Sequence, residues 1–145
     1  MTMSMAACGT KGQEQPPPVD EIALCGTDYP SYAPGMTVKA GALTAKLISA
    51  SPSPPRQKVP NHWIVELRDE QGKPVTDYTL STPDSFMPAH NHHGRSAPSA
   101  EPGLEAARAQ IRDIDFNMRG PWQVLFDVER PGAKPVTATF QVCVH

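Results

Sequence analysis

The sequence predicts an all-β fold, an immunoglobulin-like antiparallel β-sandwich of about seven strands with Greek-key connections. Two observations favour this class. The 145-residue chain has 17 prolines and 10 glycines but only 6% aromatic residues, and so many helix-interrupting residues suit short strands joined by turns. Apolar and polar residues also alternate in several short runs, as in strands with one buried face. The length suits one domain, which we place at residues 31–145, after a flexible leader and linker at residues 1–30.

The stretch from residue 61 to residue 68 predicts a strand with Trp63 on its inward face and His62 on its outward face, because apolar side chains recur at every second position. A polar, glycine- and proline-containing turn follows at residues 69–74. We expect residues 75–80 to return antiparallel as the hairpin partner of this strand. The next stretch, residues 81–103, is expected to be a long irregular segment.

The other predicted strands share the same alternation and are separated by turn signals; they cover residues 38–40, 45–47, 122–128 and 136–144. Residues 104–115 carry two patterns. Leu104, Ala107, Ile111 and Ile114 are spaced as on a helix, but alternation also runs through Ala107, Ala109 and Ile111. It resumes one step out of phase at Ile114, as a β-bulge near Arg112 and Asp113 would produce. We favour a strand, because strands are predicted on either side.

Three cysteines constrain the cellular compartment. Cys25 and Cys143 flank nearly the whole predicted domain, and we expect them to form a disulfide, which persists only in an oxidising compartment. Cys8 lies in Met5-Ala6-Ala7-Cys8-Gly9, which resembles the end of a bacterial lipoprotein signal peptide with Cys8 as the lipidated residue. A disordered leader is the alternative. The sequence therefore predicts an exported, periplasmic or envelope-attached protein.

Charge and hydropathy exclude two classes of partner. The formal net charge of −2 and the lack of a basic stripe interleaved with aromatic residues argue against nucleic-acid binding. No apolar run reaches the roughly 18 to 20 residues that a membrane-spanning helix needs. Association with a membrane is thus expected only through a lipid anchor.

The candidate functional site is a group of histidines and methionines. His90, His92 and His93, three of the five histidines, lie within four residues and close to Met87. Imidazole binds several transition metals, and a thioether adds a soft ligand that favours Cu(I) over Cu(II). Neighbouring residues of an extended chain point to opposite sides, so we expect only one of His92 and His93 to be a ligand. Met118, at the end of a predicted strand, completes the set if that end lies beside the histidine loop.

Each of these residues also has a plainer interpretation. The histidine loop can be a solvated surface loop, Met87 can anchor it to the core, and Met118 can fill the core beside Phe116. His62 is expected to be a surface residue. Asp84 and Asn91 offer hard oxygen ligands, but a site of that kind would not need a methionine.

Several stretches of the chain resemble the YtkA-like/FixH-like domains: residues 61–69, 72–75, 87–92 and 115–124. Those domains are exported immunoglobulin-like β-sandwiches, and their hallmark runs match Met-Pro-x-His-x-His and Met-x-Gly-x-Trp here. The resemblance covers residues 35–144. By analogy with small periplasmic copper-binding sandwiches, it implies copper handling and transfers Met87, His90, His92 and Met118 as ligands. The N-terminal histidine ligand of the CopC group has no counterpart here.

The sequence therefore predicts a copper-binding protein of the cell envelope that sequesters the ion or delivers it to a copper-receiving or copper-exporting protein. The alternative is a non-catalytic interaction module that presents the proline- and histidine-rich loop to a protein partner. We expect no enzyme activity. Asp84 is the only acidic residue close in sequence to the cluster, and no pattern of a nucleophilic triad or phosphate-binding loop is present.

Overall fold

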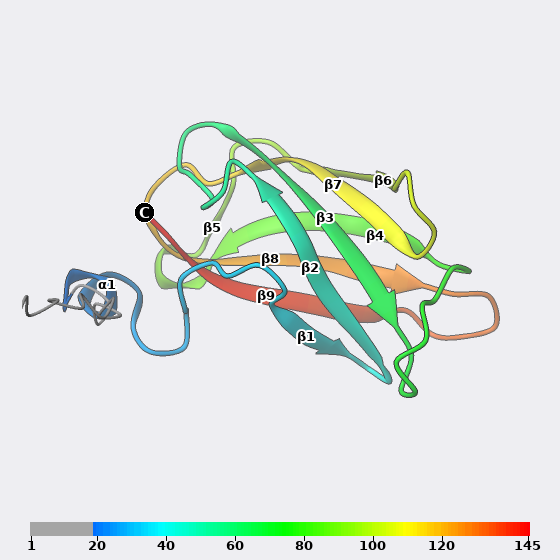
Figure 1. Ribbon diagram of the computed structural model, residues 1–145. Coiled ribbons are helices and arrows are strands. Elements are labelled where there is room, and N and C mark those ends of the chain that lie inside the picture. Colours follow the sequence, from blue (N-terminus) through cyan, green and yellow to red (C-terminus); the bar gives the residue numbers. More distant parts are fainter. Residues whose placement is uncertain (1–18) are drawn as a thin grey trace, which may run out of the picture.

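Two antiparallel sheets face each other in the computed structural model of the protein, which describes residues 19–145, with side chains from residue 21 onward (Figure 1). One sheet has five strands in the order β1-β2-β3-β7-β6, and the other has four in the order β5-β4-β8-β9. The elements in chain order are α1 (Val19–Cys25), β1 (Thr37–Ala40), β2 (Leu43–Ser51), β3 (Pro60–Arg68), β4 (Thr79–Met87), the 3-10 turn η1 (Pro88–His90), β5 (His92–His93), β6 (Ser99–Pro102), β7 (Arg108–Asp115), β8 (Gly120–Glu129) and β9 (Val136–Val144).

The connectivity is that of an immunoglobulin-like sandwich. Strands β2-β3-β7-β6 follow the order A-B-E-D, and β4-β8-β9 follow C-F-G, with β5 added beside β4. The strand β1 is an extra edge strand. The predicted fold class is therefore confirmed, with nine strands in place of about seven, because short edge strands were not predicted.

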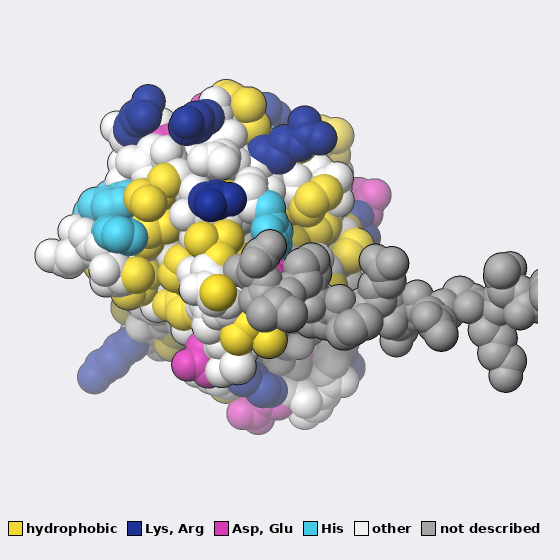
Figure 2. Space-filling model, turned by 90° about the vertical axis from the view of Figure 1, so that its left-hand side faces the viewer, with side chains coloured by type: hydrophobic (Ala, Val, Ile, Leu, Met, Phe, Trp, Pro, Cys, Tyr) yellow, Lys and Arg dark blue, Asp and Glu magenta, His cyan; other side chains and the backbone are white. Residues whose placement is uncertain are grey.

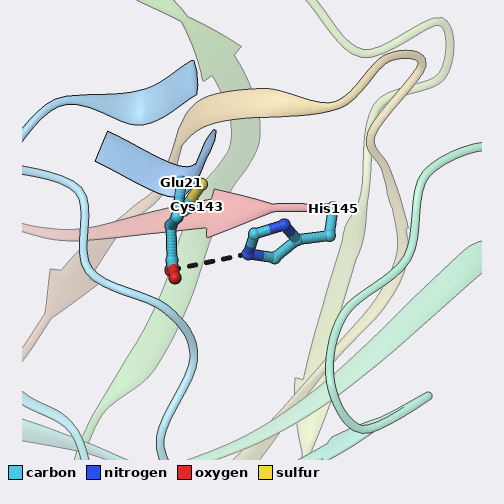
Figure 3. Close-up of side chains that lie close together, drawn as sticks. All are labelled: Glu21, Cys143 and His145. Atoms are coloured by element: carbon cyan, nitrogen blue, oxygen red, sulfur yellow. Dashed lines mark ion pairs between the residues drawn. The ribbon is translucent and has the colours of Figure 1, made fainter. Parts of the chain in front are cut away.

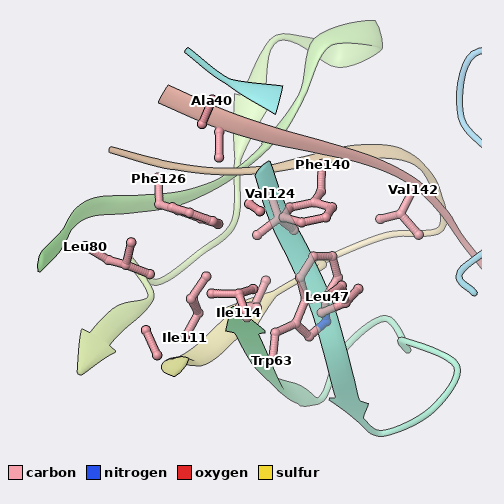
Figure 4. Packing of buried hydrophobic residues seen from close by; sticks show 14 of the residues in the cluster. Ala40, Leu47, Trp63, Leu80, Ile111, Ile114, Val124, Phe126, Phe140 and Val142 are labelled. Atoms are coloured by element: carbon pink, nitrogen blue, oxygen red, sulfur yellow. The ribbon is translucent and has the colours of Figure 1, made fainter. Parts of the chain in front are cut away.

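The core lies between the sheets and is built by alternation along each strand (Figure 4). Trp63 from β3 contacts the ring of Phe140 from β9 edge to face, with ring centroids 5.8 Å apart. On β2, β3, β8 and β9, the inward-facing side chains at every second position are almost completely buried. Burying each such side chain stabilises the fold by roughly 1.5–3 kcal/mol.

The segment with two patterns, residues 104–115, is a strand from Arg108 onward and not a helix. Its register against β3 shifts between Asn61 and Trp63, and Asp113 has a left-handed φ of 58°. This bulge lets Ile111 and Ile114 both point into the core, as the out-of-phase alternation predicted.

The hairpin predicted between residues 61–68 and 75–80 forms only at its turn, where Arg68 pairs with Pro74 as an isolated antiparallel bridge and the amide of Val75 donates to the carbonyl oxygen of Leu67 at 2.9 Å; residues 76–80 do not continue it. The neighbours of β3 are β2 and β7, and the chain after the turn crosses to the other sheet, where β4 pairs with β5 and β8. The expectation that residues 81–103 are irregular is wrong, since this segment contains most of β4 and all of β5 and β6. Pro83 and a left-handed Thr82, with φ 45°, interrupt β4 and mask its alternation.

A buried carboxylate lies on the outer face of the five-stranded sheet. Glu66 is only 7% exposed and forms ion pairs with Arg68 and Arg108, at 2.7 Å and 3.3 Å. Nearby, the Tyr78 hydroxyl donates a hydrogen bond to the carbonyl oxygen of Ala107 at 2.8 Å. Burial, reinforced by the charge of Glu66, raises the pKa of Tyr78 to about 12. This hydrogen bond joins the segment before β4 to the start of β7.

The N-terminal segment is fastened to β9. Cys25 forms a disulfide with Cys143, as predicted, and the amide of Cys143 donates to the carbonyl oxygen of Pro30 at 2.8 Å. Ser31 pairs with Cys143 as a parallel bridge. Within residues 19–145, no helix has the length and apolarity to cross a bilayer. The predicted domain boundary at residue 30 stays a prediction, and Cys8 lies outside the described residues.

Candidate metal site

A tight hairpin brings the histidines next to Met87. Residues 88–91 connect β4 to β5, and Met87 is paired with His92 across the ladder. Pro88 begins the 3-10 turn, where its fixed φ is suitable, and Asn91 ends it in the left-handed region with φ 50° and ψ 48°. The sequence thus folds here as a short β-turn loop that presents successive side chains at one end of the sandwich.

The two adjacent histidines point to opposite faces of this hairpin. His92 is half-buried, and its Nε2 lies 3.4 Å from the Sδ of Met118. His93 is exposed and its Nδ1 lies 2.7 Å from a carboxylate oxygen of Asp84, with its ring 4.9 Å from that of Phe86. Of the two, His92 therefore lies with the methionines, and His93 is engaged elsewhere.

The ring of His92 lies between two groups that accept hydrogen bonds. Its Nδ1 is 3.2 Å from the carbonyl oxygen of His93, and its Nε2 faces the Met118 sulfur. A neutral imidazole carries one N–H, so it satisfies only one of these contacts. With the proton on Nδ1, the lone pair of Nε2 faces the lone pairs of a thioether. A metal ion between them would satisfy both, and a hydrogen bond from the other ring nitrogen is the usual support of a histidine ligand.

Met118 is held in place by Trp122. The indole Nε1 of Trp122 donates to the carbonyl oxygen of Met118 at 2.8 Å, and the indole is completely buried. The His92 ring packs against the same indole at a centroid distance of 5.5 Å and an interplanar angle of 72°. Trp122 therefore contacts both members of the imidazole and thioether pair. The sequence placed Trp122 on an alternating strand and in the Met-x-Gly-x-Trp run, but neither pattern reveals its hydrogen bond to Met118.

Met87 lies beneath the same loop. Its side chain is completely buried, and a Cβ added to Gly120 would lie 3.1 Å from the Met87 methyl carbon. Gly120 has a φ of +135°, which L residues rarely adopt. The glycine thus permits close packing of Met87 under the turn between Met118 and Trp122.

His90 is the most exposed part of the group. It lies on the 3-10 turn, and its ring centroid is 6.0 Å from that of His92. In Figure 2, histidine side chains form a patch at one edge of this end of the molecule, bordered by hydrophobic side chains. One region of the molecule therefore contains Met87, His90, His92 and Met118. Their exposure to solvent increases from the buried thioether of Met87 to the exposed imidazole of His90.

The donor set suits a soft metal ion. The facing imidazole nitrogen of His92 and thioether sulfur of Met118 match the ligand preference of Cu(I). The Nε2 of His92 and the Sδ of Met118, which lie 3.4 Å apart, would hold such an ion. Asp84 does not add an oxygen ligand to this group, because its carboxylate pairs with His93 on the other face of the hairpin.

A second group of polar side chains lies at the chain end (Figure 3). Glu21, Cys143 and His145 have potential ligand atoms within 4.8 Å of one another, and the Nε2 of His145 is 3.4 Å from a carboxylate oxygen of Glu21. Cys143 has no thiolate to offer, because its sulfur is bonded to Cys25. Two ligands remain, so this group is an ion pair beside a disulfide.

No protein-family model matches the chain, and no curated protein sequence matches it significantly. Among solved structures, the fold is similar to that of a DUF4426 family protein from Pseudomonas aeruginosa PAO1. The TM-score is 0.52 at 16% identity, over 75% of this chain and 96% of that protein. A similarity at this level of identity supports the β-sandwich and carries no functional information.

Proposed function

We propose that the protein binds copper, preferentially Cu(I), through Met87, His92 and Met118, with His90 as an outer ligand. The observation that carries this proposal is the 3.4 Å approach of the His92 Nε2 to the Met118 Sδ. These atoms come from β5 and from the loop between β7 and β8, 26 residues apart in sequence. Two metal-binding groups from separate elements thus face each other at the surface end of the core.

We further propose that the protein is an exported copper carrier of the YtkA-like type and not an enzyme. The disulfide between Cys25 and Cys143 supports an oxidising compartment. Thioether and imidazole ligands support storage or transfer of an ion, since metal-assisted hydrolysis would need an open coordination position and a nearby base. Attachment to a membrane through a lipid on Cys8 belongs to the same proposal.

The test is competition for Cu(I) against a chromogenic chelator, with the purified protein in its disulfide-bonded form. We expect His92→Ala and Met118→Leu each to weaken Cu(I) binding by roughly 100-fold or more, since changes even to the supporting partners of ligands cost 10- to 100-fold. Binding should also weaken on acidification, because the imidazoles must be neutral to bind the ion.

Two matched variants serve as controls. His93→Ala removes a neighbouring imidazole that faces away from Met118, and Met36→Leu removes a partly buried thioether that belongs to the core boundary. Both should retain the wild-type Cu(I) affinity. If His92→Ala and His93→Ala behave alike, the copper proposal is refuted and the interaction-module alternative becomes the better explanation of this loop.

A further inference from the structure

The arginines of this protein fall into two groups. Within residues 19–145, four of them form ion pairs: Arg68, Arg108, Arg112 and Arg130. The other three, Arg56, Arg95 and Arg119, form no ion pair with a described residue, and all three are exposed. They lie in the loops β2–β3, β5–β6 and β7–β8, which are at the same end of the sandwich as the candidate metal site (Figure 1).

Lys58, in the loop between β2 and β3, joins this group. It is exposed and has no ion pair among the described residues. We call the set of Arg56, Lys58, Arg95 and Arg119 the basic surface. Figure 2 shows Lys and Arg side chains gathered on this end of the molecule, on the same face as the histidine patch.

Backbone hydrogen bonds fix the loops that carry these cations. The amide of Lys58 donates to the carbonyl oxygen of Phe116 at 2.8 Å, and the amide of Arg95 donates to a carboxylate oxygen of Asp115 at 2.6 Å. The amide of Arg56 donates to the Oδ1 of Asn61 at 3.0 Å. Lys58 and Arg95 are therefore held against residues 115 and 116, just before Met118, and Arg56 is held against the start of β3.

Few carboxylates offset these charges. A hollow of about 330 Å³ between the loops is lined by Lys58, Asp113 and Asp115 together with small and apolar residues. The Asp115 carboxylate accepts a hydrogen bond from the Arg95 amide and keeps its negative charge, so two acids, Asp113 and Asp115, stand against the four cations of the basic surface. Unpaired arginines on fixed loops suit recognition of carboxylates, because the planar guanidinium forms two parallel hydrogen bonds with them.

We infer that the basic surface docks an acidic protein surface, and that the docked partner receives the metal ion from the neighbouring Met/His cluster. The delivery step rests on the proposed copper function, whereas the docking step does not. Oppositely charged surfaces steer encounter and set its orientation, and they raise association rates by roughly 10- to 1,000-fold at low salt. A partner docked on the basic surface would face His90 and His92, because these histidines lie at the same end of the sandwich.

The experiment uses the Cu(I)-loaded protein and two synthetic acceptor peptides with the same methionine ligands, one flanked by glutamates and one by serines. Stopped-flow transfer rates are measured at low and high salt. We expect the glutamate-flanked acceptor to be faster by roughly tenfold or more at low salt. Arg56→Glu combined with Arg95→Glu should abolish this advantage.

The control is Lys73→Glu combined with Lys134→Glu. These lysines lie in turns at the opposite end of the sandwich and form no ion pair among the described residues, and their replacement changes the net charge by the same amount. This variant should keep the advantage. Equal loss in the two variants, or equal rates for the two acceptors with the wild type, would overturn the inference.

Docking is also measured without copper, by fluorescence anisotropy of the labelled glutamate-flanked peptide with the metal-free protein. Failure of copper binding with arginine-dependent peptide binding retained would reject the proposed function and keep the docking surface. The reverse result would reject the docking surface alone. Co-sedimentation with phosphatidylglycerol vesicles that depends on the same arginines, without peptide binding, would assign the basic surface to a membrane and overturn the inference.

Discussion

Removal of the disulfide between Cys25 and Cys143 should destabilise the protein strongly. The bond closes a loop with a sequence separation of 118 residues. In the chain-entropy model, a loop of this length restricts the unfolded chain enough to contribute about 5 kcal/mol. The measured range for native bonds in small secreted domains is roughly 2–5 kcal/mol. With a urea dependence of roughly 2 kcal/mol per molar, the unfolding midpoint should fall by roughly 1–2.5 M in a double Cys→Ala variant.

The assay is equilibrium urea unfolding monitored by tryptophan fluorescence, because Trp63 and Trp122 are both buried in the folded protein. The wild type under reducing conditions should match the double variant, which separates loss of the bond from loss of the cysteine side chains. A midpoint shift below about 0.5 M would contradict the closed loop. So would reduced wild type that unfolds like the oxidised form.

Two further predictions concern packing and pH. Gly120→Ala places a methyl group 3.1 Å from the end of Met87 at a φ of +135°, so it should lower the free energy of unfolding by about 1–3 kcal/mol and weaken Cu(I) binding. Gly132→Ala, also at positive φ but with nothing within 4 Å of the new methyl, should affect stability alone, and equal Cu(I) affinities of the two variants would contradict this account. The pKa of Tyr78 is raised to about 12 in the folded state, so this side chain ionises at lower pH in the unfolded chain than in the folded protein. The free energy of unfolding should therefore decline from about pH 10 to pH 12. Tyr78→Phe should lose roughly 0.5–1.5 kcal/mol at neutral pH with the hydrogen bond to Ala107, and a decline as steep as that of the wild type in alkaline urea titrations would argue against the assignment.

Alternation along the chain was enough to predict the strands that carry the core. Trp63, Trp122 and their neighbours on the same strands are buried at every second position, and even the bulge before Ile114 left a readable change of phase. The partner of β3 was not predictable in this way. A polar turn after Arg68 is required both when a chain folds back in one sheet and when it crosses to the other, so the local pattern does not separate the two cases.

The candidate site was only partly predictable for a related reason. His90 and His92 are neighbours in sequence, so a short loop keeps them close to Met87 in any fold. The approach of Met118 to His92 depends on how two loops meet at the end of the sandwich, and no spacing along the chain encodes it. The pairing was expected only through the resemblance to the YtkA-like/FixH-like domains and the analogy that it implies.

The length of the turn between Met87 and His92 decides which imidazole accompanies the Met118 sulfur. Because side chains alternate along a strand, one residue inserted into this turn would exchange the orientations of His92 and His93. His93 would then take the place beside the Met118 sulfur and the Trp122 indole, and His92 would turn toward Asp84. The composition of the loop would be almost unchanged, yet a different imidazole would accompany the sulfur.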